Sequence, residues 1–158
     1  MIDLTILIGL QASGKSSFFR RYLAATHVHV SKDHFRNNRN PARRQVKLIT
    51  DSLLAGRSVA VDNTNATVEL RRELITLGRS FGATITGYYF SANLKDCLAR
   101  NAMRTGKARV PDVGLFSVAK KIVRPTNAEG FDQLFFVRMA DGESFDAKPW
   151  IKEENAVG

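Results

Sequence analysis

The sequence has few cysteines, few acidic residues and no long apolar run, and each shortage narrows the class of protein. Cys97 is the only cysteine among 158 residues, so an internal disulfide is excluded and we expect a reducing, cytoplasmic location. No apolar run approaches the roughly 20 residues that cross a membrane as a helix, so we expect no membrane segment. The 15 acidic residues face 24 basic ones, giving a net charge of +9, and this excess favours anionic partners, nucleic acid first among them.

What remains is an ordinary globular composition. Hydrophobic residues make up 44% of the chain, and its length is enough for one domain with a real core. We find no internal repeat and no low-complexity segment, which argues against a repeat architecture. We therefore predict a single domain over residues 1–150, followed by a polar tail over residues 151–158.

Residues 9–16 (GLQASGKS) have the spacing G-x-x-x-x-G-K-S of a phosphate-binding P-loop. An apolar run typical of a buried strand, residues 4–8, precedes them, and a helical pattern follows. Glycines let the backbone N–H groups point at phosphate oxygens, and the helix start adds a positive dipole end. In such loops the lysine, here Lys15, reaches the β- and γ-phosphates, and the hydroxyl of Ser16 ligates Mg²⁺. The pattern predicts a site for a nucleoside triphosphate.

The next expected strand, residues 27–31, ends just before Asp33 and Arg36. Ligands gather at the carboxyl ends of parallel strands, so both side chains are expected near the substrate. Asp33 suits two tasks, a general base for an attacking hydroxyl or a helix N-cap, and position alone does not separate them. Arg36 suits an anionic group on the acceptor. The three histidines have no cysteine or acidic partner at metal-ligand spacing, so we expect strand and surface roles for them.

A basic segment then leads into a helix that we expect to be capped by Asn40. Val46, Ile49 and Leu53 form its inward stripe. The charged face of this segment carries the cations Arg39, Arg43, Arg44 and Lys47. That face suits a sugar-phosphate backbone, although a plain solvated surface has the same composition.

The strand expected over residues 58–62 ends in Asp62, the form of a Walker B strand, so Asp62 is a second candidate for supporting Mg²⁺. The following helix has Leu70, Leu74, Leu77 and Phe81 on one face. A strand over residues 84–90 and a helix capped by Asn93 come next.

A basic loop breaks that helix at residues 106–111. Arg104, Lys107 and Arg109 cluster here, which is typical of a phosphate-covering lid but also of a basic turn between helices. Residues 134–137 form the last expected strand. Five strands alternating with helices predict an α/β fold: a P-loop NTPase with a five-stranded parallel sheet sandwiched by helices, like nucleoside-monophosphate kinases, with a basic lid.

Taken in order, these stretches resemble the 5′-kinase domain of polynucleotide kinases over about residues 4–138. The resemblance is carried by residues 9–16, Asp33 with Arg36, residues 62–65 (DNTN), residues 100–104 (RNAMR), residues 106–107 (GK), residues 110–111 (VP) and residues 125–131 (PTNAEGF). No D-x-D-x-T motif of the family's phosphatase domain is present. The resemblance therefore implies a kinase-only version, or the kinase part of a repair system spread over several chains.

The resemblance also implies roles for particular residues. Lys15, Asp33 and Arg104 match catalytic residues, Asp33 as the base for a polynucleotide 5′-hydroxyl and Arg104 as the lid arginine on the ATP phosphates. The expected nucleotide-binding residues are Gly9, Gln11, Ala12, Ser13, Gly14, Lys15, Ser16, Ser17, Arg100 and Arg104. The expected substrate-binding residues are Asp33, Arg36, Asn63, Thr64 and Asn65, and the expected metal-binding residues are Ser16 and Asp62.

The implied function is an ATP-dependent, Mg²⁺-dependent polynucleotide 5′-hydroxyl kinase acting on DNA or RNA ends. Two alternatives stay open at the level of sequence. One is a small-molecule or nucleotide kinase on the same scaffold, because a fold does not fix the acceptor. The other is a non-catalytic, nucleotide-dependent module that binds nucleic acid. The sequence does not indicate an oligomeric state.

Overall fold

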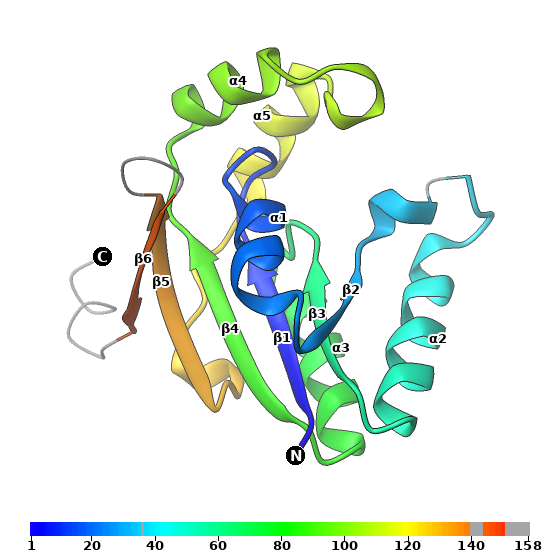
Figure 1. The fold of residues 1–158 in the computed structure, drawn as a ribbon. Helices are drawn as coiled ribbons and strands as arrows, with labels where there is room; N and C mark the ends of the chain where they lie inside the picture. The colour runs from blue at the N-terminus through cyan, green and yellow to red at the C-terminus, as the bar shows by residue number, and fades with distance from the viewer. Residues whose placement is uncertain (36, 140–143, 151–158) are drawn as a thin grey trace.

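A computed structural model describes residues 1–35, 37–139 and 144–150, and it is built around one six-stranded sheet (Figure 1). The strand order is β2-β3-β1-β4-β5-β6. The strands are β1 (Asp3–Ile8), β2 (His27–Val30), β3 (Ser58–Asp62), β4 (Thr84–Phe90), β5 (Gln133–Met139) and β6 (Phe145–Pro149). The first five run parallel to one another, and β6 runs antiparallel to β5.

Helices cover both faces of the sheet (Figure 1). They are α1 (Lys15–Phe18), which continues as a short π-helix (Phe19–Leu23), α2 (Pro41–Leu54), α3 (Val68–Ser80), α4 (Leu94–Ala102) and α5 (Asp112–Lys121). Three 3-10 turns complete the described elements: Lys32–Phe35, Gly106–Ala108 and Asn127–Glu129. The predicted α/β P-loop class is confirmed.

Strand β1 lies at the centre of the sheet, and its side chains alternate between two cores. Leu4, Ile6 and Ile8 pack with residues of α2 and α3 on one face. Leu7 points to the other face and packs with Phe18 and residues of the turn after it. Because both faces are covered, β1 is apolar on both sides, which explains the continuous apolar run in the sequence. The end of this buried strand holds the P-loop.

The predicted number of five strands was one too low. Strand β6 pairs with β5, with Phe135 opposite Pro149, and its backbone is extended by a bond from the Trp150 N–H to the carbonyl of Leu134 at 2.8 Å. It is an exposed edge strand without apolar alternation, and its proline is tolerated there because an edge residue need not donate to a neighbour. The sequence therefore carried no strand signal. The tail predicted for residues 151–158 lies outside the described residues.

The predicted inward stripes of α2 and α3 were wrong at one residue each. Ile49 and Leu53 of α2 are buried, but Val46 is 46% exposed, and Leu70 of α3 is 40% exposed. Helix α2 begins at its predicted cap, where Asn40 accepts from the Arg43 N–H at 3.1 Å, and Thr67 caps α3. Both exposed side chains line a cleft, so an open space takes the place of core at this level of the helices.

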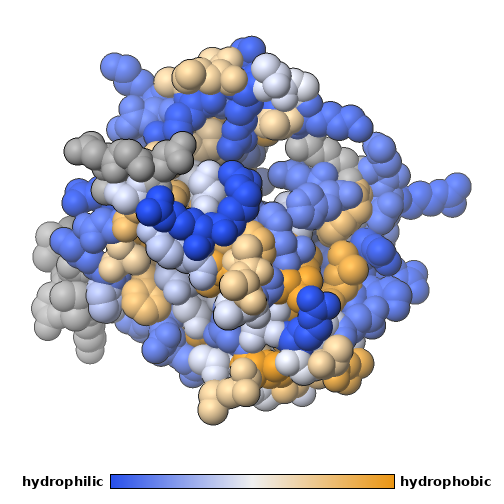
Figure 2. Space-filling view, in the orientation of Figure 1, coloured by the Kyte–Doolittle hydropathy of each residue, from blue (hydrophilic) through white to orange (hydrophobic). Residues whose placement is uncertain are grey.

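The surface facing the viewer in Figure 2 is largely hydrophilic, with apolar side chains in smaller patches. Within the described ranges, no helix is long and apolar enough to cross a membrane.

Candidate active site

The P-loop follows β1 in a conformation that needs its glycines. Gly14 is the N-cap of α1 with φ +105°, a left-handed backbone that side chains disfavour. A Cβ there would also lie 2.8 Å from Met139 Cε and 2.9 Å from Phe145 Cε1. At Gly9 a Cβ would lie 2.9 Å from the hydroxyl oxygen of Ser13. The loop is thus packed from behind, partly by β5 and β6.

Lys15 is buried and ties the loop together. Its Nζ donates to the carbonyl oxygens of Gly9 at 2.9 Å and Leu10 at 2.6 Å. Burial lowers the pKa of Lys15 to about 8, against the attraction of the Asp62 carboxylate. A phosphate group brought next to this amine would restore the preference for the charged form, because an opposite charge favours it.

Ser16 and Asp62 meet where the motif predicts a magnesium site. The Ser16 hydroxyl donates to Asp62 Oδ2 at 2.7 Å. Burial alone would raise the pKa of the Asp62 carboxyl, but the hydrogen bond with His29, the charge of Lys15 and the hydrogen bond from Ser16 hold that pKa below its ordinary value. An ionised carboxylate beside a hydroxyl is the oxygen donor set that Mg²⁺ prefers. The described residues contain no cluster of three histidine, cysteine or acidic side chains that could hold a metal by themselves. Triphosphate oxygens would have to supply part of the coordination.

The sequence did not indicate that His29 of β2 belongs to this site. Its Nε2 lies 2.8 Å from Asp62 Oδ2, and its ring stacks on Phe19 with 4.1 Å between centroids and 15° between planes. The predicted strand location of His29 was correct, and its acidic partner is one that no metal-ligand spacing in the sequence indicated. His27 likewise pairs with Asp3 at 2.9 Å. These partners are 33 and 24 residues away in the sequence, so no local spacing could reveal them.

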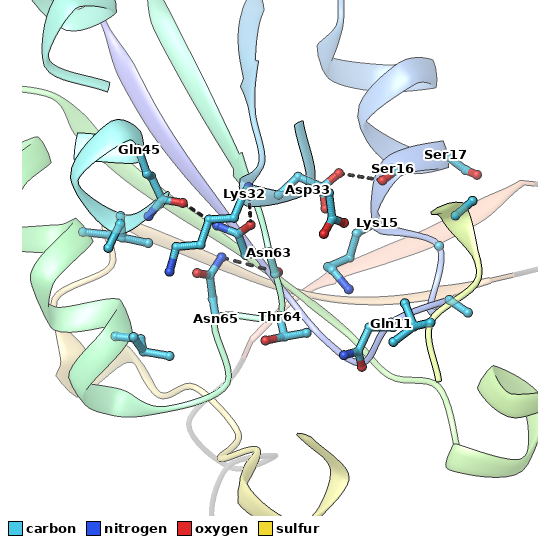
Figure 3. A pocket seen from close by; sticks show the side chains of 18 of the residues that line it. Gln11, Lys15, Ser16, Ser17, Lys32, Asp33, Gln45, Asn63, Thr64 and Asn65 are labelled. Carbon is cyan, nitrogen blue, oxygen red and sulfur yellow. Dashed lines mark hydrogen bonds between the residues drawn. The ribbon is translucent and has the colours of Figure 1, made fainter. Parts of the chain in front are cut away.

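A cleft of about 860 Å³ runs from the P-loop to the facing helices α2 and α3. In Figure 3, Lys15 and Ser16 lie on one side, Gln45 and Asn63 on the other, and Asp33 between them. Of the predicted site residues, the cleft is lined by Gln11, Ala12, Gly14, Lys15, Ser16, Ser17, Asp33, Asp62, Asn63, Thr64, Asn65 and Arg104. The structure thus brings most of the predicted nucleotide and acceptor residues into one space.

Within the described part of the chain, three predicted site residues do not line the cleft: Gly9, Ser13 and Arg100. Gly9 and Ser13 support the loop, and the buried Ser13 hydroxyl has no hydrogen-bond partner within the described part of the chain. Arg100 donates from Nε to the carbonyl oxygen of Ala12 at 2.7 Å, so it holds the P-loop from α4. Arg36 lies outside the described residues.

Asp33 lies in the 3-10 turn Lys32–Phe35, and its side chain is exposed to the cleft. Its backbone N–H donates to the Ser31 hydroxyl at 3.3 Å. The following helix, α2, is capped by Asn40 instead. The cap interpretation of Asp33 is therefore not supported, and the general-base interpretation stays a prediction.

Residues 63–65 connect three elements around the cleft. Asn63 Oδ1 accepts from the Lys32 N–H at 2.9 Å, and its Nδ2 donates to Gln45 Oε1 at 2.6 Å. The Asn65 amide donates to the carbonyl of Leu7 at 2.7 Å, from a backbone with φ 45°. The carbonyl of Thr64 accepts from the Gly9 N–H at 3.0 Å. Each residue thus has a contact that shapes the site, and direct substrate binding by them stays a prediction.

Next to residues 63–65 lies a buried ion pair that the sequence did not indicate. Arg71 has no exposed surface; its Nε and Nη2 donate to Glu129 at 2.8 and 3.2 Å, and its Nη1 donates to the Asn65 carbonyl at 2.9 Å. Glu129 also accepts from the Thr126 N–H at 2.8 Å. Part of the stretch 125–131 that carries the resemblance thus has a structural task. Removing one partner of such a pair leaves a buried charge without its counter-ion, which is strongly destabilising.

The predicted basic lid is the connection between α4 and α5. Fully buried Asn101 holds both of its ends: its amide donates to the Val110 carbonyl at 2.6 Å and accepts from the Val110 N–H at 3.0 Å. Arg104 and Lys107 of this connection line the cleft. Arg104 is partly exposed and donates to the Ala108 carbonyl at 3.3 Å.

This geometry defines a P-loop protein, and comparison with known proteins narrows the class. A family profile described as an AAA domain matches residues 4–120, which is most of the chain, and the chain belongs to that family. The resemblance to polynucleotide kinases is confirmed: the bifunctional polynucleotide phosphatase/kinase of Schizosaccharomyces pombe is 26% identical over 135 residues, or 82% of this chain. The chain spans only 32% of that relative's length.

Solved structures show the same fold at low identity. Chaetomium thermophilum Kti12 in complex with ADP-AlF3 has a TM-score of 0.74 and 15% identity, covering 89% of this chain and 91% of its own. A gluconokinase from Sinorhizobium meliloti has a TM-score of 0.61 and 17% identity, covering 88% and 83%. The chain therefore has the kinase-like, nucleotide-binding P-loop fold, and these likenesses leave its acceptor open.

Proposed function

We propose that the protein is an ATP-dependent polynucleotide 5′-hydroxyl kinase. The observation that carries this proposal is that Asp33, Lys15 and Arg104 line one cleft. A kinase of this type needs a base at the acceptor oxygen and cations at the transferring phosphate, and these three side chains supply both.

In the proposed reaction, the 5′-hydroxyl oxygen attacks the γ-phosphorus of ATP while its proton passes to the Asp33 carboxylate. The bond between the γ-phosphorus and the β,γ-bridging oxygen breaks, and ADP leaves. Lys15, released from the Gly9 and Leu10 carbonyls, and Arg104 from the lid stabilise the charge on the phosphate oxygens. The P-loop N–H groups and the start of α1 hold the remaining phosphates.

Ser16 and Asp62 are the residues that would hold Mg²⁺. When bound, the metal neutralises charge on the phosphate oxygens. His29 fixes the orientation of the Asp62 carboxylate, because residues that hydrogen-bond to a metal ligand often orient it.

The nucleic-acid acceptor is supported by the similarity to the phosphatase/kinase and by the charge beside the cleft. Lys32 lines the cleft, the exposed Arg39 lies just before α2, and the exposed Arg43 and Arg44 lie in its first turn. Cations in this arrangement suit a phosphate backbone and make binding depend on salt.

A small-molecule kinase is the second candidate, and it is supported by the likeness of the fold to that of a gluconokinase. It differs in its acceptor, and its activity would not increase when the acceptor carries a phosphate on the 3′ side of the attacked hydroxyl. A non-catalytic nucleotide-binding module differs more sharply, because it would bind ATP without any transfer.

The test is incubation of the protein with ATP labelled at the γ-phosphate and a panel of acceptors. The panel holds 5′-hydroxyl DNA and RNA oligonucleotides, nucleosides with and without a 3′-phosphate, and sugars that include gluconate. We expect label on the oligonucleotides and nucleoside 3′-phosphates, and none with a Lys15→Ala control. Label on a sugar alone would support the second candidate, and ATP binding without transfer to any acceptor would support the third.

A further inference from the structure

The end of the cleft away from the P-loop has an apolar lining. Val46 of α2 and Leu70 of α3 are 46% and 40% exposed there, and Leu74 and Leu77 of α3 line the space with them. By helical periodicity both exposed residues belong to core stripes, yet they lie against open space. Exposed apolar groups of this size are stabilised when a ligand removes them from water. Their position on two different helices of the same cleft indicates a ligand with apolar faces.

The polar groups at this end are few. Gln45 of α2 uses its amide oxygen to accept from Asn63 at 2.6 Å, so its NH₂ group is the part that can face a ligand. Glu73 of α3 adds a carboxylate, which accepts hydrogen bonds and repels anions. Lys32 lines the same cleft and is drawn on the Gln45 side of it in Figure 3. These few polar groups beside an apolar wall leave most hydroxyl groups of a sugar unpaired, because each hydroxyl needs a partner.

A flat heteroaromatic ring fits these groups. Its faces are apolar, and its edge carries amino, carbonyl or ring-nitrogen groups for Gln45 and Glu73. The cleft is continuous from the P-loop past Asp33 to this end. A nucleoside whose 5′-hydroxyl lies at Asp33 would therefore extend its base toward α2 and α3.

We propose that Val46 and Leu70, with Gln45 and Glu73, form a binding site for the nucleobase of the acceptor's 5′-terminal nucleoside. This inference rests on the proposed function, since it identifies which part of a polynucleotide the apolar end recognises. The backbone phosphates then lie toward the cations rather than between the helices.

The experiment compares two acceptors, an oligonucleotide with an intact 5′-terminal nucleoside and the same strand with a tetrahydrofuran abasic residue at that position. We expect wild-type kcat/KM to favour the intact strand by about ten-fold or more. Val46→Ser and Leu70→Ser should narrow that ratio while leaving kcat/KM on the abasic strand within about two-fold of the wild type. Leu54→Ser is the matched control: Leu54 is 69% exposed on the same helix and does not line the cleft.

Equal activity of the wild type on both strands would overturn this inference and leave the proposed function standing. An equal loss on both strands in Val46→Ser and Leu70→Ser would also overturn it, because it would indicate a structural effect that melting curves would register. A wild-type protein that phosphorylates no oligonucleotide would overturn the proposed function itself.

Discussion

His29 Nε2 and Asp62 Oδ2 lie 2.8 Å apart, and the same carboxylate oxygen accepts the hydroxyl of Ser16 at 2.7 Å. Stacking of the His29 ring on Phe19 fixes the plane of the imidazole. The Asp62 carboxylate, for which we propose a role in Mg²⁺ binding, is therefore oriented from two sides, by His29 of the neighbouring strand β2 and by Ser16 of α1.

The first prediction concerns this orientation. His29→Ala should lower the apparent affinity for Mg²⁺ in phosphotransfer about 10- to 100-fold, the usual cost of losing a partner of a metal ligand. His29→Gln should recover much of it, because the glutamine amide can donate from a similar position. The measurement is initial rate against Mg²⁺ concentration. The matched control is His27→Ala on the same strand, whose partner is Asp3; if it raised the Mg²⁺ requirement as much, the effect would be one of strand stability.

The second prediction concerns Arg104. Arg104→Ala should lower kcat by two orders of magnitude or more, roughly 3 kcal/mol of barrier, because an arginine on the transferring phosphates acts mainly in the transition state. Arg104→Lys should recover only part, since an ammonium lacks the planar fork of donors. Steady-state kinetics would measure this. Unchanged kcat in Arg104→Ala would make the connection between α4 and α5 a plain turn.

The third prediction concerns stability and pH at the far end of the sheet. Asp132 accepts from Arg79 at 2.9 and 3.1 Å and from the Ile85 N–H at 2.8 Å, and Arg79 and then Ile85 hold the pKa of its carboxyl below the ordinary value near 3.8. Its stabilising effect is therefore complete above the unfolded pKa and is lost as pH falls through the lower folded pKa.

Asp132→Asn should lower the free energy of unfolding at pH 7 by less than about 1 kcal/mol, because the pair is partly exposed. This difference in the free energy of unfolding between the variant and the wild type should shrink toward zero in acid. Denaturant titrations at several pH values would measure it. Asp51→Asn, which removes the exposed Lys47 pair on α2, is the control. If the difference in the free energy of unfolding stayed constant down to the acid transition, the stabilising effect of Asp132 would come from packing rather than from its charge.

The parts of this site that the sequence predicted are those whose chemistry is local. The P-loop needs fixed residue types at fixed spacing, and Asp62 ends a strand whose apolar run is visible. Arg71 and Glu129 are 58 residues apart, so their pairing depends on how the chain folds back.

Elements without a distinctive pattern were missed for a different reason. Strand β6 is polar on its exposed edge and has no alternation to read. Val46 and Leu70 carry the periodicity of a core, and only the packing of α2 and α3 determines whether core or cleft lies against them. A hydrophobic stripe predicts packing against other groups, and at Val46 and Leu70 the sequence could not distinguish a protein core from an open cleft.

The last prediction separates chemistry from acceptor binding. Asp33→Asn should leave the binding of ATP and of oligonucleotide nearly unchanged while turnover falls at least 100-fold, because the amide keeps the shape but does not accept the proton. Binding would be followed by fluorescence anisotropy of a labelled 5′-hydroxyl strand, and turnover by transfer of the labelled γ-phosphate.

The paired variant is Arg36→Ala. From the sequence, Arg36 is expected to hold a phosphate on the 3′ side of the attacked nucleoside, so this change should reduce kcat/KM on nucleoside 3′-phosphates and spare bare nucleosides. If Asp33→Asn turned over at the wild-type rate, the base would have to be another group, and the proposed reaction would lose its central residue.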